Sequence, residues 1–247
     1  DPKTGYLLQS GTTDKNSTTS LALEKINSLE CSPDGLHLYA ITREWGEVSA
    51  VACFTRNRNT GKIIYSSKIE TKDYNFSYQW GGHTKLKFSH DGKNAYVIGS
   101  NAITSFSRNP VNGSLSLRQV LVDGNSDPSS TVDGLWHASD LIISPNGLDL
   151  YVAAEGSYKI GHFKINPSDG KLSHNGSMNY SRYVDHDGPD YLEISNDGKA
   201  VFVVGTLGNA LSIFKRDLQS GNLTFHNVLR KEEGIEGLAS PVDIVLD

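Results

Sequence analysis

A unit of about 50 residues repeats four times along the chain, and a repeat of that period constrains the fold more than any other feature of the sequence. Each unit contains a turn of the form Ser-x-Asp-Gly or Ser-x-Asn-Gly, beginning at Ser32, Ser89, Ser144 and Ser195. Asp-Gly or Asn-Gly between two apolar runs predicts a β-hairpin with a type I′ turn, in which both central residues have a positive φ. The repeat therefore predicts paired strands and an all-β chain.

Four strands are predicted in each unit. The first strand precedes the Ser-x-Asp-Gly turn, and the second strand follows it. The third strand ends near a phenylalanine that recurs at Phe54, Phe106, Phe163 and Phe214. A second family of turns leads to the fourth strand, with glycines at Gly61, Gly113, Gly170 and Gly221. Four strands joined by short hairpins are typical of one blade of a β-propeller.

We therefore predict an all-β propeller, or a segment of one, that forms a single domain over residues 1–247. Four complete, four-stranded blades are expected at about 26–72, 82–122, 137–180 and 189–230. One unpaired strand is expected at each terminus, at 5–12 and at 241–247. Open sheet edges can pair with another chain. Three arrangements are considered: further blades of a longer chain, neighbouring subunits that complete each other, or a five-bladed ring with one thin blade.

Composition and missing motifs limit the classes of partner. The chain carries 23 Lys and Arg against 28 Asp and Glu, a net charge of -5, which gives no general attraction for phosphate backbones. Apolar runs such as 201–204 are far shorter than the roughly 20 residues of a membrane-spanning helix. Signatures such as GxSxG, HExxH, CxxC and the P-loop are missing. We therefore expect no nucleic acid partner, no membrane span and no cofactor.

The repeat resembles that of a known family. Ser-Pro-Asp-Gly-x-x-Leu-Tyr at 32–39, followed by Phe-x-Arg-Asn and Thr-Gly-x-Ile, is similar to the repeat of lactonase-type β-propellers, which include 6-phosphogluconolactonase-like and carboxymuconate-cyclase-like proteins. The resemblance runs from about Thr4 to Asp247. It implies seven blades and, in enzymatic members, an Arg, His and Glu set at the mouth of the central channel. These motifs concern turns and blade packing, and they assign no residue to that set.

Residues just before the first strands are candidates for chemistry, because the connectors there share one face around the channel of a propeller. They include His83, His137 and the run Asp185-His186-Asp187, with Lys85, Asp140 and Asp243 slightly further along their strands. A neutral imidazole beside a carboxylate can act as a general base or a metal ligand. The preferred interpretation is that polar residues around a solvated channel bind water. His90 and His226 are isolated and are interpreted as surface residues.

Two further sets of residues suggest binding. Trp45, Trp80 and Trp136 lie on the connector face and could stack on a carbohydrate, although packing between blades is the preferred interpretation. Asp123, Asn125 and Asp127 resemble the start of a calcium loop. Pro128 then stands where that loop needs Gly, and Gly134 where it needs Glu. We therefore prefer a polar connector to a metal site.

Sequons and cysteines bear on the compartment. Six Asn-x-Ser/Thr sequons favour an extracellular or secreted protein that carries N-glycans. They lie at Asn16, Asn75, Asn112, Asn175, Asn179 and Asn222. Cys31 and Cys53 fall on the first and third strands of one blade, which lie about 9–10 Å apart, beyond the roughly 7 Å that a disulfide allows. We expect no bond between them and expect Cys31 to be a small core residue.

Three functions follow as hypotheses. The preferred one is an extracellular, glycosylated structural or interaction propeller, whose open edges near 6–9 and 242–246 are completed by other blades or by neighbouring subunits. The second is a lactonase-like hydrolase or cyclase acting at the channel mouth with His83, His137, Asp185, His186 or Asp187. The third is a carbohydrate-binding propeller. The open edges, the sequons and the lack of a recognisable catalytic set favour the first hypothesis and make an enzyme less favoured.

Overall fold

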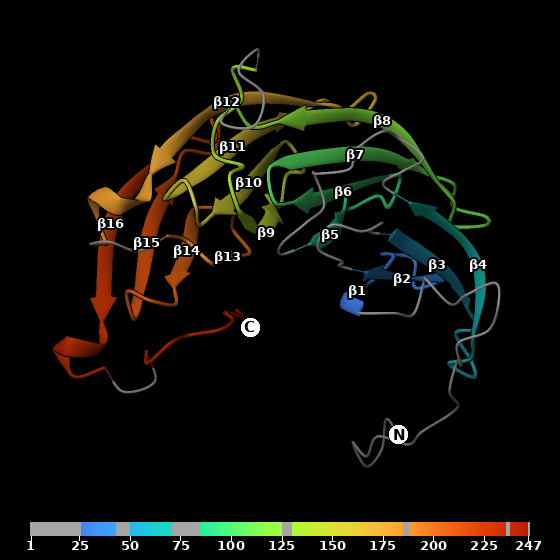
Figure 1. The fold of residues 1–247 in the computed structure, drawn as a ribbon, viewed down its shortest axis with the longest axis horizontal. Helices are drawn as coiled ribbons and strands as arrows, with labels where there is room; N and C mark the ends of the chain where they lie inside the picture. Colours follow the sequence, from blue (N-terminus) through green and yellow to red (C-terminus); the bar gives the residue numbers. More distant parts are fainter. Residues whose placement is uncertain are drawn as a thin grey trace.

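The computed structural model describes residues 26–42, 50–70, 84–124, 130–184, 188–235 and 238–246. In these residues, sixteen strands form four antiparallel sheets, and the strands of every sheet are neighbours in sequence order. Figure 1 shows the four sheets side by side around an arc, with their first strands toward the inside. The prediction of an all-β fold with four complete, four-stranded blades is confirmed.

We number the blades in chain order. Blade 1 consists of β1 (Ile26–Cys31), β2 (His37–Thr42), β3 (Ala50–Arg56) and β4 (Ile63–Glu70). Blade 2 consists of β5 (Lys85–Phe88), β6 (Asn94–Gly99), β7 (Ala102–Arg108) and β8 (Leu115–Val122). Blade 3 consists of β9 (Ala138–Ile143), β10 (Asp149–Ala154), β11 (Lys159–Ile165) and β12 (Leu172–Asn179). Blade 4 consists of β13 (Tyr191–Ile194), β14 (Ala200–Gly205), β15 (Ala210–Arg216) and β16 (Leu223–Arg230).

Two single-turn 3₁₀ helices, η2 (Tyr180–Arg182) and η3 (Lys231–Glu233), follow β12 and β16. Across the described ranges, no helix has the length and apolar character needed to cross a membrane.

The hydrophobic core lies between successive blades. Tyr39 and Val51 of blade 1 pack with Leu86 and Phe106 of blade 2, and equivalent clusters join blade 2 to blade 3 and blade 3 to blade 4. The recurrent phenylalanine is buried in all four blades. Burial of such a side chain stabilises the fold by about 1.5–3 kcal/mol, which explains why the phenylalanine recurs in step with the blades.

The hairpin turns differ from the predicted type I′ geometry. Gly35 has a φ of 65°, whereas Asp34 is outside the positive-φ region. The Ser32 hydroxyl donates to the Asp34 carboxylate at 2.6 Å and accepts the His37 N–H at 3.0 Å, and the Gly35 N–H donates to the Ser32 carbonyl at 2.7 Å. Because the serine and the acid hold the loop, the glycine alone takes the left-handed conformation. The other three turns repeat this Ser to Asp or Asn contact.

Cys31 is exposed, so the prediction that it is a small core residue is wrong. The equivalent residues Phe88 and Ile194 are buried because a preceding blade packs on them. No described residue packs on that face of blade 1. Cys53 is buried, and both thiols are free, with β2 between their two strands.

The segment from Pro241 to Leu246 forms no hydrogen-bonded ladder with the other described residues, and the unpaired strand expected at 241–247 stays a prediction. Figure 1 shows the segment running toward the centre of the arc, and its Pro241 carbonyl accepts a hydrogen bond from Thr206 Oγ1 at 3.0 Å. A strand is defined by its hydrogen-bond ladder with a neighbour, and among the described residues none pairs with this segment. The other predicted terminal strand, at 5–12, lies outside the described residues.

Candidate functional site

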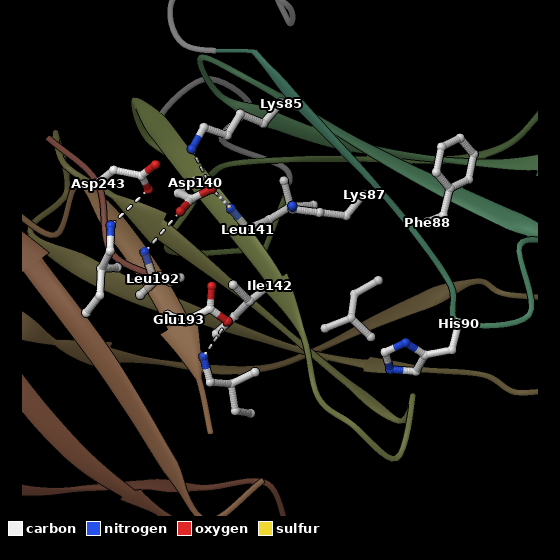
Figure 2. Close-up of a pocket in the computed structure, with 13 residues that line it drawn as sticks. Lys85, Lys87, Phe88, His90, Asp140, Leu141, Ile142, Leu192, Glu193 and Asp243 are labelled. Atoms are coloured by element: carbon white, nitrogen blue, oxygen red, sulfur yellow. Dashed lines mark hydrogen bonds and ion pairs between the residues drawn. The ribbon is translucent and has the colours of Figure 1, made fainter. Parts of the chain in front are cut away.

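The first strands of blades 2, 3 and 4 line a cavity on the inside of the arc. The cavity has a volume of about 400 Å³ and is bordered by β5, β9, β13 and the segment from Pro241 to Leu246. Its ionisable side chains are Lys85, Lys87, His90, Asp140, Glu193 and Asp243 (Figure 2). Asp140 is only 5% exposed, and a charged side chain is rarely so buried unless it is paired or functional. The cavity is therefore the first candidate for a functional site.

Lys85 and Asp140 form an ion pair on the cavity wall. Lys85 Nζ lies 2.9 Å from Asp140 Oδ1, and the pair joins β5 of blade 2 to β9 of blade 3. The same Nζ lies 4.9 Å from the centroid of the Tyr191 ring on β13, within the range of a cation–π contact. Lys85 also lines two smaller cavities of about 190 Å³ each. Lys85 therefore borders three cavities.

Asp140 uses both of its carboxylate oxygens. Oδ1 accepts the Leu141 N–H at 2.9 Å in addition to the contact with Lys85, and Oδ2 accepts the Leu192 N–H of blade 4 at 3.0 Å. Asp140 thus connects the first strands of three blades. Because its oxygens are occupied by these donors, Asp140 fits the role of positioning Lys85 better than that of a general base.

Glu193 and Asp243 line the same cavity and are less constrained. Each accepts the backbone N–H of the next residue through one oxygen, at 3.0 Å from Ile194 and at 2.9 Å from Ile244. Within the described parts of the chain, no lysine or arginine forms an ion pair with either carboxylate. The second oxygen of each is therefore open to water or a ligand in the cavity.

His90 belongs to the cavity wall as well as to the surface. It is exposed, as predicted, and its Nε2 lies 2.9 Å from the carbonyl oxygen of Ser144 in blade 3. A carbonyl oxygen only accepts hydrogen bonds, so the neutral ring is assigned its proton on Nε2. The Nδ1 lone pair is then the acceptor that His90 offers to a ligand.

Burial and neighbouring charges shift the pKa of two further groups on the inner strands. Burial raises the pKa of Glu30, although the positive charges of Lys87 and Lys85 act in the opposite direction. The pKa of the Tyr191 phenol is raised as well. Burial is the largest cause of that shift, followed by the negative charges of Asp190, Asp140 and Asp243. The inner wall therefore sets the cations of blade 2 between the carboxylates of the other blades.

Comparison with known proteins shows the family of the chain. Residues 81–231 match the family described as "Lactonase, 7-bladed beta-propeller", which is 151 of the 247 residues. The chain belongs to this family. No curated protein matches the sequence of this lactonase-family propeller.

Solved structures with a similar fold include two proteins provisionally named 6-phosphogluconolactonases. The one from Bacteroides fragilis is 22% identical, with a TM-score of 0.65, and the one from Bacteroides uniformis is 22% identical, with a TM-score of 0.67. Each match covers 88% of this chain and 56% of the other. The periplasmic gluconolactonase of Pseudomonas aeruginosa is 22% identical with a TM-score of 0.66, over 83% of this chain and 54% of its own. At this identity the likeness concerns the fold, and this lactonase-family chain spans little more than half the length of these proteins.

His137 is the one predicted histidine of the connectors that lies within the described residues. It is exposed, has a φ of 51°, and stacks on the Trp136 ring with 5.4 Å between ring centroids. Gly156 allows this arrangement, because a Cβ there would lie 2.4 Å from Trp136 Cδ1. His137 is not among the residues that line the cavities around Lys85. His83, Asp185, His186 and Asp187, as well as Trp45 and Trp80, lie outside the described residues.

The three calcium-loop candidates do not form a described cluster. Asp123 is buried, and its Oδ2 accepts the Leu135 N–H at 2.8 Å, which fastens the connector between β8 and β9. Asn125 and Asp127 lie outside the described residues. In the described ranges, no group of three or more His, Cys, Asp or Glu side chains is placed to hold a metal ion.

Of the sequon residues, Asn16 and Asn75 lie outside the described residues. The other four, Asn112, Asn175, Asn179 and Asn222, are all exposed.

Glu193 and the cavity position of His90 were missed by sequence reasoning. Glu30, Lys87 and Glu193 share the third position of their four-residue inner runs. That recurrence of charge at one position of the inner strands is the signal that could have found Glu193.

Proposed function

We propose that this chain contributes the catalytic cavity of a lactone hydrolase. One observation carries the proposal: Lys85, whose ammonium group is held by Asp140, lines three cavities on the inner strands of a lactonase-family propeller. Family membership favours this function over the structural and interaction role that the sequence alone suggested. The names of the neighbouring structures support sugar lactones as the class of substrate.

The chemistry needs few groups. Water attacks the carbonyl carbon of the lactone, negative charge develops on the carbonyl oxygen, and the ring C–O bond then breaks. The product is a hydroxy acid, in which one proton of the water has moved to the former ring oxygen. A cation that faces the carbonyl oxygen stabilises the developing charge, which is the role we assign to Lys85.

A base near the same cavity must accept the proton of the attacking water. Glu193 and Asp243 each keep one carboxylate oxygen open to the cavity. The Nδ1 lone pair of His90 is a third acceptor on the wall. We assign the proton transfer to this set, and Asp140 to the positioning of Lys85.

Hydrolysis of glucono-δ-lactone by the full chain, followed as acid release at constant pH, tests the proposal. The wild-type chain should exceed the spontaneous rate, and Lys85→Gln should lower kcat by about 10²–10³-fold, the range for loss of one donor to an oxyanion. Lys199→Gln is the matched control, because Lys199 is an exposed lysine in the turn of blade 4. A wild-type rate equal to the spontaneous one, or a folded Lys85→Gln variant with full activity, would refute the proposal.

A further inference from the structure

The joint between two successive blades has an outer end, where the fourth strand of one blade meets the beginning of the fourth strand of the next. At the joint between blades 2 and 3, Gln119 of β8 closes this end. Its Nε2 donates to the Leu172 carbonyl at 3.0 Å, and its Oε1 accepts the Leu172 N–H at 2.8 Å. At the joint between blades 1 and 2, the Ser66 hydroxyl donates to the Asn112 carbonyl at 3.0 Å. Both joints are thus closed by a side chain of the earlier blade.

The joint between blades 3 and 4 lacks such a contact. By the register of the third and fourth strands, Gly176 of β12 stands at the position of Gln119. Leu223, the first residue of β16, stands at the position of Leu172. Glycine has no side chain to reach across, and any other residue would be strained at its φ of 116°. The end of this joint is instead an outer cavity of about 460 Å³, whose wall includes His162, Gly176, Met178, Arg182, Tyr183 and Leu223.

The outer cavity borders backbone groups that have no partner within their sheet. Leu223 faces Arg216 across the β15–β16 ladder, and beside this pair the Asp217 N–H donates to the Asn222 carbonyl at 3.0 Å. Hydrogen-bonded and non-hydrogen-bonded pairs alternate along an antiparallel ladder, so the N–H and C=O of Leu223 point away from β15. In the described part of the chain, no side chain hydrogen-bonds to either group. Leu172 is 4% exposed, whereas Leu223 is only half-buried.

The rest of the wall supplies a cation. Arg182, the last residue of η2, is exposed, and among the described residues no carboxylate forms an ion pair with it. His162 is occupied at both ring nitrogens, with Nε2 2.8 Å from Asp149 Oδ1 and Nδ1 3.1 Å from Asn175 Nδ2. No aspartate or glutamate is among the described residues that line the outer cavity. The open polar groups are therefore the backbone of Leu223 and the guanidinium group of Arg182.

We propose that the outer cavity binds a small molecule that carries a primary carboxamide and a carboxylate. The carboxamide pairs with the N–H and C=O of Leu223, as the Gln119 carboxamide pairs with those of Leu172. The carboxylate binds Arg182, because a guanidinium group matches a carboxylate in charge and geometry.

The size and place of the outer cavity fit a second site. Its volume of about 460 Å³ lies within the range of small-molecule sites. It shares no lining residue with the three cavities that Lys85 borders. The proposal is therefore independent of lactone hydrolysis, and either one can fail without the other.

Glutaramate, the monoamide of glutaric acid, is the probe, and ¹H–¹⁵N correlation spectra of the full chain report on each backbone N–H. We expect the Leu223 amide to shift as glutaramate is added, with a Kd in the millimolar range for so small a ligand. The Leu172 amide is the internal control and should not shift, because Gln119 already occupies it. Glutarate has no N–H to donate to the Leu223 carbonyl and should bind about tenfold more weakly.

Two substitutions test the two halves of the site. Gln119→Gly reproduces the arrangement of blade 3 in blade 2, so the Leu172 amide should then begin to shift with glutaramate. Arg182→Ala should weaken binding at Leu223 by about tenfold. Arg58→Ala, which removes an exposed arginine of blade 1, is the matched control and should leave binding unchanged.

Four results would overturn the proposal. They are no response of the Leu223 amide to glutaramate, equally tight binding of glutarate, unchanged binding by folded Arg182→Ala, and a Leu172 amide that stays unresponsive in folded Gln119→Gly.

Discussion

Two tyrosines at equivalent positions allow a matched test of what one hydroxyl contributes at a blade joint. The Tyr151 hydroxyl donates to the Gly221 carbonyl and accepts from Arg216 Nε at 2.8 Å. Tyr96 is equally buried, but its hydroxyl has no hydrogen-bond partner in the described structure. Ile165 of blade 3 stands where blades 2 and 4 have arginine, which explains the difference.

The expected magnitudes follow from these contacts. Tyr151→Phe leaves the buried Arg216 Nε–H and the Gly221 carbonyl without this partner, and each such loss costs about 1–3 kcal/mol. Some of that cost is offset because the buried hydroxyl itself is removed, so we expect a fall of about 2–3 kcal/mol in the free energy of unfolding. Tyr96→Phe removes a hydroxyl that is buried without a partner. We expect that variant to be unchanged or more stable by up to about 1 kcal/mol.

Urea denaturation of both variants and of the wild type, followed by tryptophan fluorescence, checks the prediction. Equal slopes against denaturant would show that the variants differ in stability rather than in the extent of unfolding. If the two substitutions changed the free energy of unfolding by the same amount, hydrogen bonding at the joint could not be the cause, and the reasoning would be refuted.

Two further predictions concern pH and glycosylation. Burial acts to raise the pKa of Asp34, but hydrogen bonds from Ser32, from the Leu36 N–H and from Arg108 outweigh it and lower the pKa to about 2, from 3.8. The ionised Asp34 carboxylate therefore stabilises the folded state fully above pH 3.8, and this contribution is lost as the pH falls toward 2. We expect a loss of about 1–2 kcal/mol, because the side chain is 31% exposed, and an acid titration of unfolding that is flatter for Asp34→Asn would show it. If the protein is secreted and glycosylated, as the sequons predict, glycosidase treatment of the natural protein lowers its mass, whereas an unchanged mass argues against N-glycans.

The local parts of the fold could be predicted because they depend on short stretches of sequence. The Ser-x-Asp-Gly turns and the recurrent phenylalanine set the strand order within each blade, and the structure has that order. The type I′ geometry was wrong because the Ser32 and Asp34 side chains hold the loop, an effect that the Asp-Gly pair does not reveal.

Contacts between blades were the part that sequence reasoning missed. Lys85, Asp140 and Asp243 were noted as lying along inner strands, but the Lys85 to Asp140 pair depends on β5 standing beside β9. Cys31 was assigned to the core because equivalent residues of other blades are apolar, yet its burial depends on a preceding blade. The bond between Arg108 and Tyr39 likewise joins residues that are close only after the blades pack.

The ion pair at the candidate site crosses the joint that lacks an arginine. Between blades 2 and 3, Lys85 contacts Asp140 on the inside, and Gln119 on the outside exchanges two hydrogen bonds with the Leu172 backbone, at 3.0 and 2.8 Å. Lys85 could therefore act on structure as well as on a substrate, and the size of its effect separates the two. Its side chain is 32% exposed, but that of Asp140 is only 7% exposed, so loss of Lys85 leaves a buried carboxylate without its cation and should cost about 1–3 kcal/mol of stability.

A loss of stability lowers the fraction of folded chain, whereas loss of an oxyanion donor lowers the rate of the folded chain. A loss of 10²-fold or more in a Lys85→Gln chain that urea denaturation shows to be fully folded under the assay conditions therefore requires Lys85 to act on the reacting lactone. A loss of fivefold or less would assign Lys85 to the joint and leave the cavity without its proposed oxyanion donor.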